Sequence, residues 1–126
     1  SRRRKSVSVE NTYHEDLASL GEWQAKLGTL TESLKRRMER LDSGYLVSAL
    51  FVKARFNDFT TATCETPGDG VDEQVLANLL ESLWKRRPEP ARLLGIGVRL
   101  RDAGNPAQAD MFPEERLAAL QSRREA

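Results

Sequence analysis

Residues 51–63 read FVKARFNDFTTAT, and their pattern decides the fold because it predicts a β-hairpin. Lys53 and Arg55 alternate with apolar residues, so one face of the first strand would be charged and the other buried. The Asn-Asp pair inside FNDF is typical of the turn between two antiparallel strands. We therefore expect strands at residues 46–56 and 59–65 that share a buried face and an exposed face.

A strand and a helix are predicted on the N-terminal side of this hairpin. Polar and apolar residues alternate over residues 5–13, as in a half-buried strand. Leucine, tryptophan and methionine then recur at spacings of three and four over residues 17–41, which predicts one long amphipathic helix. Its start is expected within TYHEDLASL, and irregularities are expected near Gly21 and Gly28.

A helix and a strand are also predicted on the C-terminal side. Apolar residues at helical spacing indicate a second amphipathic helix over residues 72–87. RLLGIGVRLR, residues 92–101, predicts a last strand in which Gly95 and Gly97 would let a phosphate backbone approach closely. The order β-α-β-β-α-β folds most simply into a four-stranded, mostly antiparallel sheet with both helices on one face. We therefore predict an α+β domain whose other sheet face is open.

The composition is that of an ordinary soluble globular domain, with 39% hydrophobic and 31% charged residues in a chain of 126. No apolar run approaches the roughly 20 residues that a membrane span needs, so no membrane partner is expected. Cys64 is the only cysteine, and we interpret it as a small, at least half-buried residue of a cytoplasmic protein. Because the chain begins with SRRRK and not with methionine, we expect a domain of a larger protein.

The net charge of +1 is distributed unevenly. The N-terminal arm and the predicted strands hold nine basic and three acidic residues, so the remainder of the chain is acidic. A positive sheet face fringed by hydroxyl groups suits the phosphates of nucleic acid. On charge alone, the alternative that Lys53, Arg55 and Arg99 only solvate an open sheet stays equally possible. Basic clusters at residues 35–40 and 85–87 lie near helix C-termini, and we interpret them as solvated cations.

No catalytic centre is recognisable in the sequence. His14 is the only histidine and Cys64 the only cysteine, so the sequence offers neither a metal cluster of these residues nor a Cys-His pair. The GIG segment lies inside a predicted strand and does not open a helix, as a phosphate-binding loop would. We therefore expect a binding module without catalytic or metal-ligating residues.

Three segments together resemble a known family: RRRKSVSVENTYHEDL, FVKARFNDFTTAT and RLLGIGVRL. In this order they are similar to the little finger, the C-terminal DNA-binding domain of Y-family translesion DNA polymerases, and most similar to the bacterial DNA polymerase IV branch. The resemblance covers residues 2–101. It implies a basic linker at residues 1–5 that joins a polymerase core absent from this chain, a little finger at residues 6–101, and a flexible tail at residues 102–126.

The resemblance also implies how the domain works. In the family, the sheet lies along the major groove and holds template and primer phosphates with little base reading. The parent would be a Mg²⁺-dependent nucleotidyltransferase whose metal and catalytic carboxylates belong to the missing palm. This chain would therefore need no cofactor and would not polymerise DNA alone. Charge, hydroxyl groups and matched positions together predict that double-stranded template-primer DNA is bound by Arg3, Arg4, Lys5, Ser6, Ser8, Lys53, Arg55, Thr61, Thr63, Arg92 and Arg99.

Two residues depart from the family pattern. Cys64 stands where some relatives carry a basic residue, and Phe51 replaces a smaller one. The sequence leaves open whether the Phe51 side chain lies on the buried or the open face.

QADMF, residues 108–112, resembles the sliding-clamp-binding peptide of bacterial family members, which has glutamine, two variable residues and two hydrophobic residues. An extended peptide can place two hydrophobic side chains in an apolar pocket while the glutamine forms hydrogen bonds. The resemblance implies the beta subunit of the bacterial clamp as partner, bound by Gln108, Asp110, Met111 and Phe112. Ala109 replaces the usual leucine, and the alternative is that Met111 and Phe112 pack in the core.

The leading hypothesis is a non-catalytic module that grips duplex DNA for an error-prone translesion polymerase and tethers its catalytic core to the clamp. An RNA-binding domain of the RRM kind shares the element order, but it stacks bases on sheet aromatics where this chain has Lys53, Arg55 and Arg99. A ferredoxin-like enzyme or regulatory domain is the third alternative, and no constellation of residues supports it.

Overall fold

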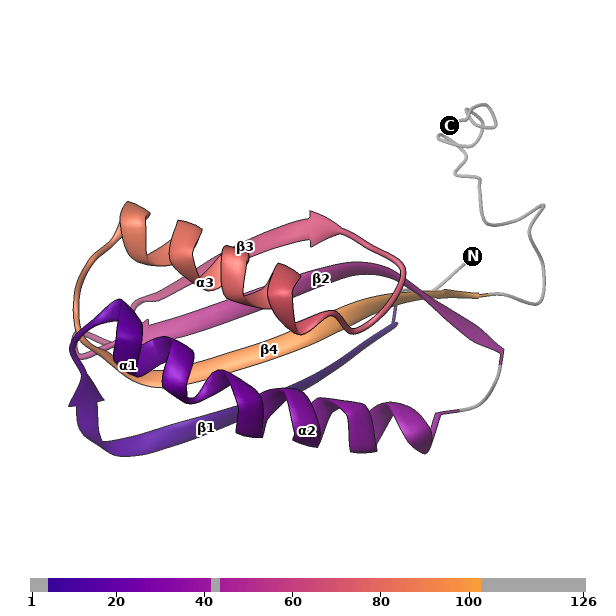
Figure 1. The fold of residues 1–126 in the computed structure, drawn as a ribbon, viewed down its shortest axis with the longest axis horizontal. Coiled ribbons are helices and arrows are strands. Elements are labelled where there is room, and N and C mark those ends of the chain that lie inside the picture. Colours follow the sequence, from indigo (N-terminus) through magenta and orange to yellow (C-terminus); the bar gives the residue numbers. More distant parts are fainter. Residues whose placement is uncertain (1–4, 42–43, 103–126) are drawn as a thin grey trace.

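The computed structural model describes residues 5–41 and 44–102, which form one sheet and three helices (Figure 1). In chain order the elements are β1 (Lys5–Leu17), α1 (Leu20–Ala25), α2 (Leu27–Glu39), β2 (Tyr45–Phe56), β3 (Thr61–Pro67), α3 (Glu73–Arg86) and β4 (Ala91–Asp102). The predicted α+β class and β-α-β-β-α-β order are confirmed, with the first predicted helix divided into α1 and α2.

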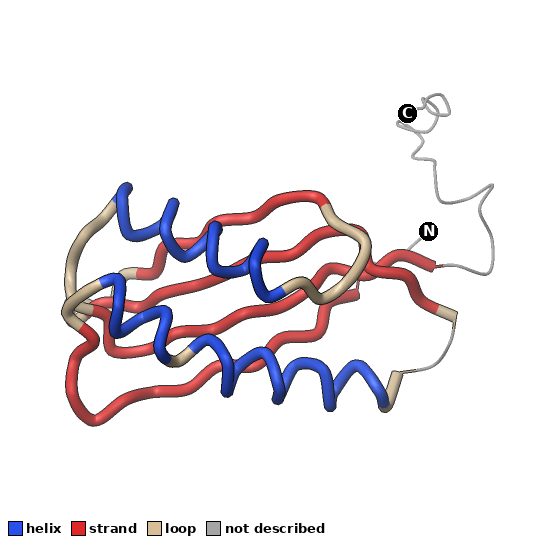
Figure 2. Tube along the Cα trace, viewed as in Figure 1, coloured by secondary structure: helices blue, strands red, loops and turns tan. Residues whose placement is uncertain are grey.

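The sheet has the strand order β1-β4-β2-β3, and each neighbouring pair is antiparallel. The last strand, β4, therefore lies between β1 and β2. All three helices cover the same face of the sheet (Figure 2). The other face carries no helix in the described part of the chain, as the sequence predicted.

The first helix starts within TYHEDLASL, as predicted, but Leu17 is not part of it. β1 continues to Leu17, which pairs with Ala91 of β4, and the helix begins three residues later at Leu20. Ser19 caps it, because the Ser19 hydroxyl accepts a hydrogen bond from the Glu22 N–H at 3.2 Å. The side chain of Leu17 is 7% exposed and its carbonyl accepts from the Trp23 indole at 3.0 Å, so strand pairing and core packing both hold this residue.

The predicted long helix is interrupted at one residue, Lys26. Lys26 ends α1 and precedes α2, with φ −87° and ψ −11°. The break between α1 and α2 thus lies between Gly21 and Gly28, near which the sequence predicted irregularities. A Cβ atom at Gly28 would meet nothing within 4 Å, so packing does not require glycine there.

The core lies between the helices and the covered face of the sheet. Trp23 is completely buried and packs edge-on against Trp84, with ring centres 5.1 Å apart. Each central strand contributes alternate residues to this core, so the predicted inward face of the hairpin is confirmed. The largest fully buried side chains besides Trp23 are Leu30, Leu34, Leu50, Val52, Leu76, Leu80, Leu83, Leu94, Ile96 and Val98.

The hairpin turn passes through a residue with left-handed backbone, Phe59, whose φ is 68°. Its N–H donates to the Phe56 carbonyl at 2.9 Å, and the Phe56 N–H donates to the Thr60 carbonyl at 3.0 Å. The turn therefore closes between Phe56 and Thr60. As a consequence β3 begins at Thr61 and not at residue 59, where the sequence predicted it.

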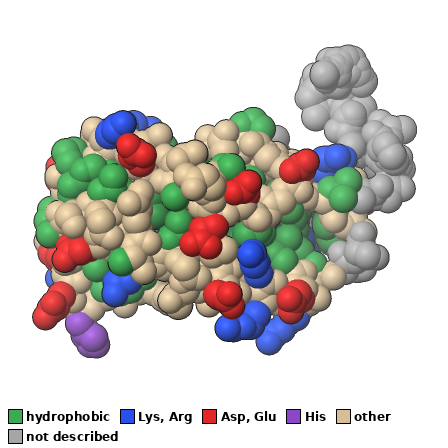
Figure 3. All heavy atoms as spheres, in the orientation of Figure 1, with side chains coloured by type: hydrophobic (Ala, Val, Ile, Leu, Met, Phe, Trp, Pro, Cys, Tyr) green, Lys and Arg blue, Asp and Glu red, His purple; other side chains and the backbone are tan. Residues whose placement is uncertain are grey.

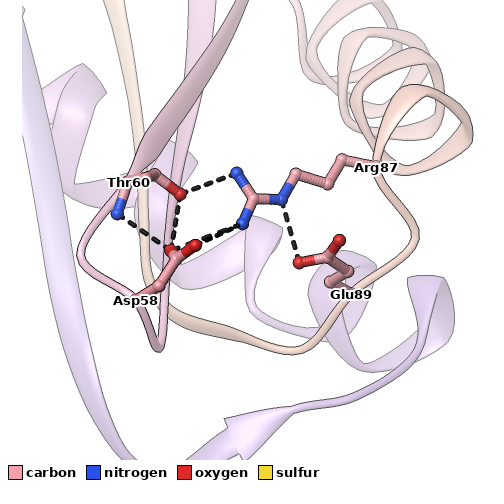
Figure 4. A network of polar contacts seen from close by, with 4 residues as sticks. All are labelled: Asp58, Thr60, Arg87 and Glu89. Atoms are coloured by element: carbon pink, nitrogen blue, oxygen red, sulfur yellow. Dashed lines mark hydrogen bonds and ion pairs between the residues drawn. The ribbon is translucent and has the colours of Figure 1, made fainter.

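Hydrogen bonds and an ion pair connect this turn to the C-terminal end of α3 (Figure 4). Asp58 Oδ1 accepts hydrogen bonds from the Thr60 N–H at 3.0 Å and from the Thr60 hydroxyl at 2.6 Å. Arg87 donates to Asp58 Oδ2 at 3.1 Å and to Glu89 Oε1 at 2.9 Å. The hydrogen bonds from Thr60, followed by the charge of Arg87, hold the pKa of Asp58 below its usual value. Arg87 therefore has a structural role, contrary to the prediction of a solvated cation.

Candidate nucleic-acid interface

The candidate interface is the sheet face without helices, which we call the open face. Strand pairing brings alternate side chains onto it. Its members are Ser6, Ser8, Glu10 and Thr12 of β1, Phe51, Lys53 and Arg55 of β2, Thr61, Thr63 and Glu65 of β3, and Leu93, Gly95, Gly97, Arg99 and Arg101 of β4. The predicted DNA-binding residues that come together here are Ser6, Ser8, Lys53, Arg55, Thr61, Thr63 and Arg99.

Two other predicted DNA-binding residues, Lys5 and Arg92, are not grouped with the residues of the open face. Lys5 pairs with the core residue Leu100, and its Nζ lies 4.8 Å from the ring centre of Tyr45, which packs against the core on the helix side. Arg92 donates through Nε to Asp16 Oδ1 at 2.9 Å, at the end of β1. Hydrogen bonds from Arg92, and then from Asn57, lower the pKa of Asp16.

Arg3 and Arg4 of the predicted DNA-binding set lie outside the described residues, as do the clamp-binding candidates Gln108, Asp110, Met111 and Phe112. The proposed linker at residues 1–5, except for Lys5, and most of the proposed tail fall outside as well.

The charge of the open face is moderately positive. Four cations against two carboxylates leave a formal charge of +2 on the residues named above. This is less than the strand segments predicted, because residues 2–4 lie outside the described residues and neither Lys5 nor Arg92 is grouped with the open face. By contrast, the helix-bearing face shows acidic and basic side chains interspersed (Figure 3). The open face therefore carries a net positive charge, which suits a polyanion.

The glycines of β4 accommodate protein side chains. A Cβ atom at Gly97 would lie 2.4 Å from Phe51 Cζ and 2.7 Å from Ser8 Cβ, and one at Gly95 would lie 3.0 Å from Glu10 Cβ. Phe51 thus lies on the open face, over Gly97. The sequence predicted that a phosphate backbone could approach closely at Gly95 and Gly97. The space above these glycines is partly filled by side chains of β1 and β2.

Two other kinds of feature are absent from the described residues: a cluster of metal-binding side chains and a membrane-spanning helix. Over residues 5–41 and 44–102, no three histidine, cysteine or carboxylate side chains are placed to hold a metal ion. Within the same ranges, each helix is too short or too polar to cross a membrane.

Comparison with known proteins agrees with this geometry. The impB/mucB/samB family C-terminal domain matches residues 4–111. The chain belongs to this family.

Relatives with curated names are DNA polymerases. DNA polymerase IV of Pseudomonas putida strain F1 is 47% identical over 112 residues, which are 88% of this chain and 32% of that protein. DNA polymerase IV of Pseudomonas syringae pv. tomato strain DC3000 is 49% identical over 100 residues, 79% of this chain and 28% of that protein. The chain therefore spans about a third of the length of the relatives that it matches.

Solved structures share the fold. A complex of the beta-clamp processivity factor and the little finger domain of PolIV matches with a TM-score of 0.70 and 28% identity, covering 75% of this chain and 86% of that chain. An insertion ternary complex of Dbh DNA polymerase has the same fold, with a TM-score of 0.61 and 15% identity over 75% of this chain and 28% of that chain. The chain is thus a little finger domain of a Y-family DNA polymerase.

Sequence reasoning missed the partners of two central cations of this little finger. Lys53 Nζ lies 2.6 Å from Glu10 Oε1, and Arg99 Nε lies 2.9 Å from Glu65 Oε2. Glu10 and Glu65 were recognised only as acidic residues of the strands. Alternation places each of them on the open face, but only the pairing register shows which cation each can reach.

The two departures from the family pattern are resolved by the fold. Cys64 pairs with Val52 on the core side and is partly buried, so the interpretation as a half-buried residue is confirmed. Phe51 lies beneath the Arg99 guanidinium, whose Cζ is 4.8 Å from the ring centre. The Phe51 ring is therefore already stacked by an arginine of the same domain.

Proposed function

We propose that this little finger domain holds the duplex DNA of a translesion polymerase through its open face. The observation that carries the proposal is the convergence of Lys53, Arg55 and Arg99 with five hydroxyl side chains on one helix-free surface. Cations and hydroxyl donors on a sheet can follow a phosphate backbone without reading bases. Ser6 and Ser8 line the β1 side of this surface, and Thr61 and Thr63 line the β3 side.

The catalytic part of the proposed mechanism lies outside this chain. Polymerisation, with the Mg²⁺ that it requires, would be carried out by the part of the relatives that the chain does not span. Residues 1–5 would link the domain to that core, and the enzyme would act in the cytoplasm. The similarity to DNA polymerase IV supports this assignment.

We further propose that residues 108–112 tether the polymerase to the sliding clamp. The similar little finger of PolIV was solved in complex with the beta clamp, which supports this partner. The motif residues Gln108, Asp110, Met111 and Phe112 would provide a polar and an apolar anchor for a clamp pocket.

The DNA proposal is tested by fluorescence anisotropy with a labelled duplex and a labelled single-stranded RNA. We expect the duplex to bind without sequence preference and to lose affinity steeply between 50 and 200 mM salt, as is typical of about 6–10 phosphate contacts. Preference for single-stranded RNA would instead support the RRM-like alternative. That alternative is disfavoured by Phe51, because Arg99 covers the only aromatic ring among the open-face residues named above.

The clamp proposal is tested with the double variant Met111→Ala/Phe112→Ala. We expect it to lose binding to the purified clamp in surface plasmon resonance while its melting temperature stays unchanged. Leu117→Ala/Leu120→Ala is the matched control, since it removes two hydrophobic side chains of the same segment outside the motif. Equal binding by both variants would refute the motif, and a large fall in melting temperature would place Met111 and Phe112 in the core.

A further inference from the structure

The two central cations of the open face are already bound by carboxylates of the same domain. Lys53 forms an ion pair with Glu10 at 2.6 Å, and Arg99 forms one with Glu65 at 2.9 Å. All four side chains are partly exposed, from 30% for Lys53 to 48% for Glu10. Both ion pairs are therefore accessible to a competing anion from solvent.

The pairing register explains why the first ion pair crosses the sheet. Glu10, Gly95 and Lys53 are neighbours in one row over β1, β4 and β2. Since Gly95 has no side chain, the Lys53 ammonium reaches across β4 to the carboxylate on the far strand. This bridge lies over the part of β4 where the sequence suggested close approach of a phosphate.

The second ion pair crosses the other half of the face. Glu65 of β3 is the direct partner of Phe51 on β2, and the Arg99 guanidinium extends over the Phe51 ring toward that carboxylate. Each cation thus belongs to a central strand and each carboxylate to an edge strand. Within the described residues, the remaining open-face cations, Arg55 and Arg101, have no carboxylate partner.

From this arrangement we infer that Glu10 and Glu65 compete with DNA phosphates for Lys53 and Arg99. A carboxylate and a phosphate accept hydrogen bonds from the same kind of N–H group, so each glutamate takes up donor capacity and charge that a phosphate would otherwise use. Whether it is displaced or stays beside the cation, the carboxylate remains near the incoming phosphate and repels it. The competition lowers the affinity of the open face and favours release of DNA. The inference rests on the proposed function of this face.

The inference predicts tighter DNA binding after removal of the competing charges. Glu10→Gln and Glu65→Gln keep the side-chain size and remove the negative charge. Because exposed ion pairs are weak, we expect each change to lower the Kd for a 20-base-pair duplex about two- to fivefold, and the double variant to lower it roughly tenfold. Fluorescence anisotropy of the full chain at constant salt measures this change, and the single variants are measured beside the double variant.

The matched control is the double variant Glu32→Gln/Glu81→Gln. It changes the net charge by the same amount and also breaks two ion pairs, with Arg36 and Lys85, but both lie on helices. Tightening by Glu10→Gln/Glu65→Gln beyond that of the control supports the competition. Equal tightening reduces the effect to net charge and overturns it. Weaker binding also overturns it, since the glutamates would then position the cations for DNA.

Failure of the inference and failure of the proposed function are separated by the variant Lys53→Ala/Arg99→Ala. If this variant binds duplex as tightly as the unmodified chain, the open face is not the DNA site and the proposed function fails. If it binds more weakly while both glutamine substitutions leave the Kd unchanged, the proposed function stands and only the competition is refuted.

Discussion

At the scale of single residues, Thr31 of α2 has an unfavourable environment. Its side chain is 2% exposed, and its Oγ1 has no hydrogen-bond partner among the described residues. A buried hydroxyl without a partner costs about 1–3 kcal/mol. Thr31→Val keeps the shape and removes the hydroxyl, so we expect the free energy of unfolding to rise by about 1 kcal/mol in urea denaturation.

The control for this substitution is Thr29→Val, two residues earlier in the same helix. Thr29 is exposed, so its replacement changes helix propensity equally without removing a buried polar atom. We expect the two variants to differ in stability. A Thr31→Val protein less stable than Thr29→Val would mean that the buried hydroxyl does find a partner.

Phe59 is a second residue whose conformation is costly. Its φ of 68° is left-handed, and 83% of its surface is exposed, so little packing compensates the strain. Phe59→Gly relieves the strain, and we expect about 0.5–1 kcal/mol of added stability in thermal or urea unfolding. Phe59→Ala is the control, since it removes the ring but keeps the strained backbone. Equal stability of the glycine and alanine variants would argue against strain at this position.

Sequence alone predicted the face on which Lys53, Arg55 and Arg99 lie, but it left the face of Phe51 open and did not show which residues touch. The alternation of Lys53 with Val52 is a local property, and it sufficed to place both side chains. The contact between Lys53 and Glu10 depends on β4 lying between their strands and on the register of both pairings. Neither can be inferred from spacing, because a shift of one residue exchanges the two faces of a strand.

At the scale of elements, the same limit explains why Leu17 was predicted to lie in the first helix. The spacing of Leu17 from the following apolar residues fits a helix, yet Leu17 also completes a strand and is buried there. Tertiary pairing with Ala91 decided between two locally acceptable structures. The helix predicted at residues 72–87 had no competing strand pairing. The observed α3 (Glu73–Arg86) lies within one residue of those bounds. Its N-cap, Asp72, accepts from the backbone of Gln74 and Val75, as the helix start requires.

The stability of the hairpin turn should depend on acid pH. The pKa of Asp58 is lowered by Thr60 and then by Arg87. A carboxylate with a lowered folded-state pKa stabilises the fold above its unfolded value of about 3.9, and this contribution is lost as pH falls through the folded value. We therefore expect Asp58→Asn to lower the melting temperature at pH 7 and to show a smaller further loss between about pH 4 and pH 2.

Asp69→Asn is the control for this titration, because Asp69 is an exposed carboxylate of the loop before α3. Differential scanning calorimetry at both ends of the pH range gives the comparison. An Asp58→Asn variant with the same acid dependence as the unmodified chain would show that the turn does not contribute to it. The acid dependence of stability would then be attributed to Asp16, whose pKa is lowered by Arg92 and then by Asn57.

At the scale of the whole molecule, the fold separates a packing face from a binding face. Three helices bury the apolar side of the sheet, and the opposite side keeps four cations in a chain of net charge +1. The sequence predicted this separation because charge and hydrophobicity alternate along each strand. It overestimated the positive charge of this face, because Lys5 and Arg92 do not lie on it and residues 2–4 fall outside the described residues.

This separation predicts that DNA binding depends on where a charge lies and not only on the total charge. Arg99→Ala removes a cation from the centre of the open face, so we expect weaker binding to unrelated duplex sequences by the same factor. If Arg99 neutralises one phosphate, the slope of log K against log salt should also become less steep by about 0.9. Arg36→Ala is the control, because it removes the same charge from α2, where the side chain is 68% exposed. Anisotropy titrations of two unrelated duplexes at four salt concentrations measure both quantities. Equal slopes for the two variants would contradict a phosphate contact at Arg99, and a loss confined to one sequence would indicate base reading.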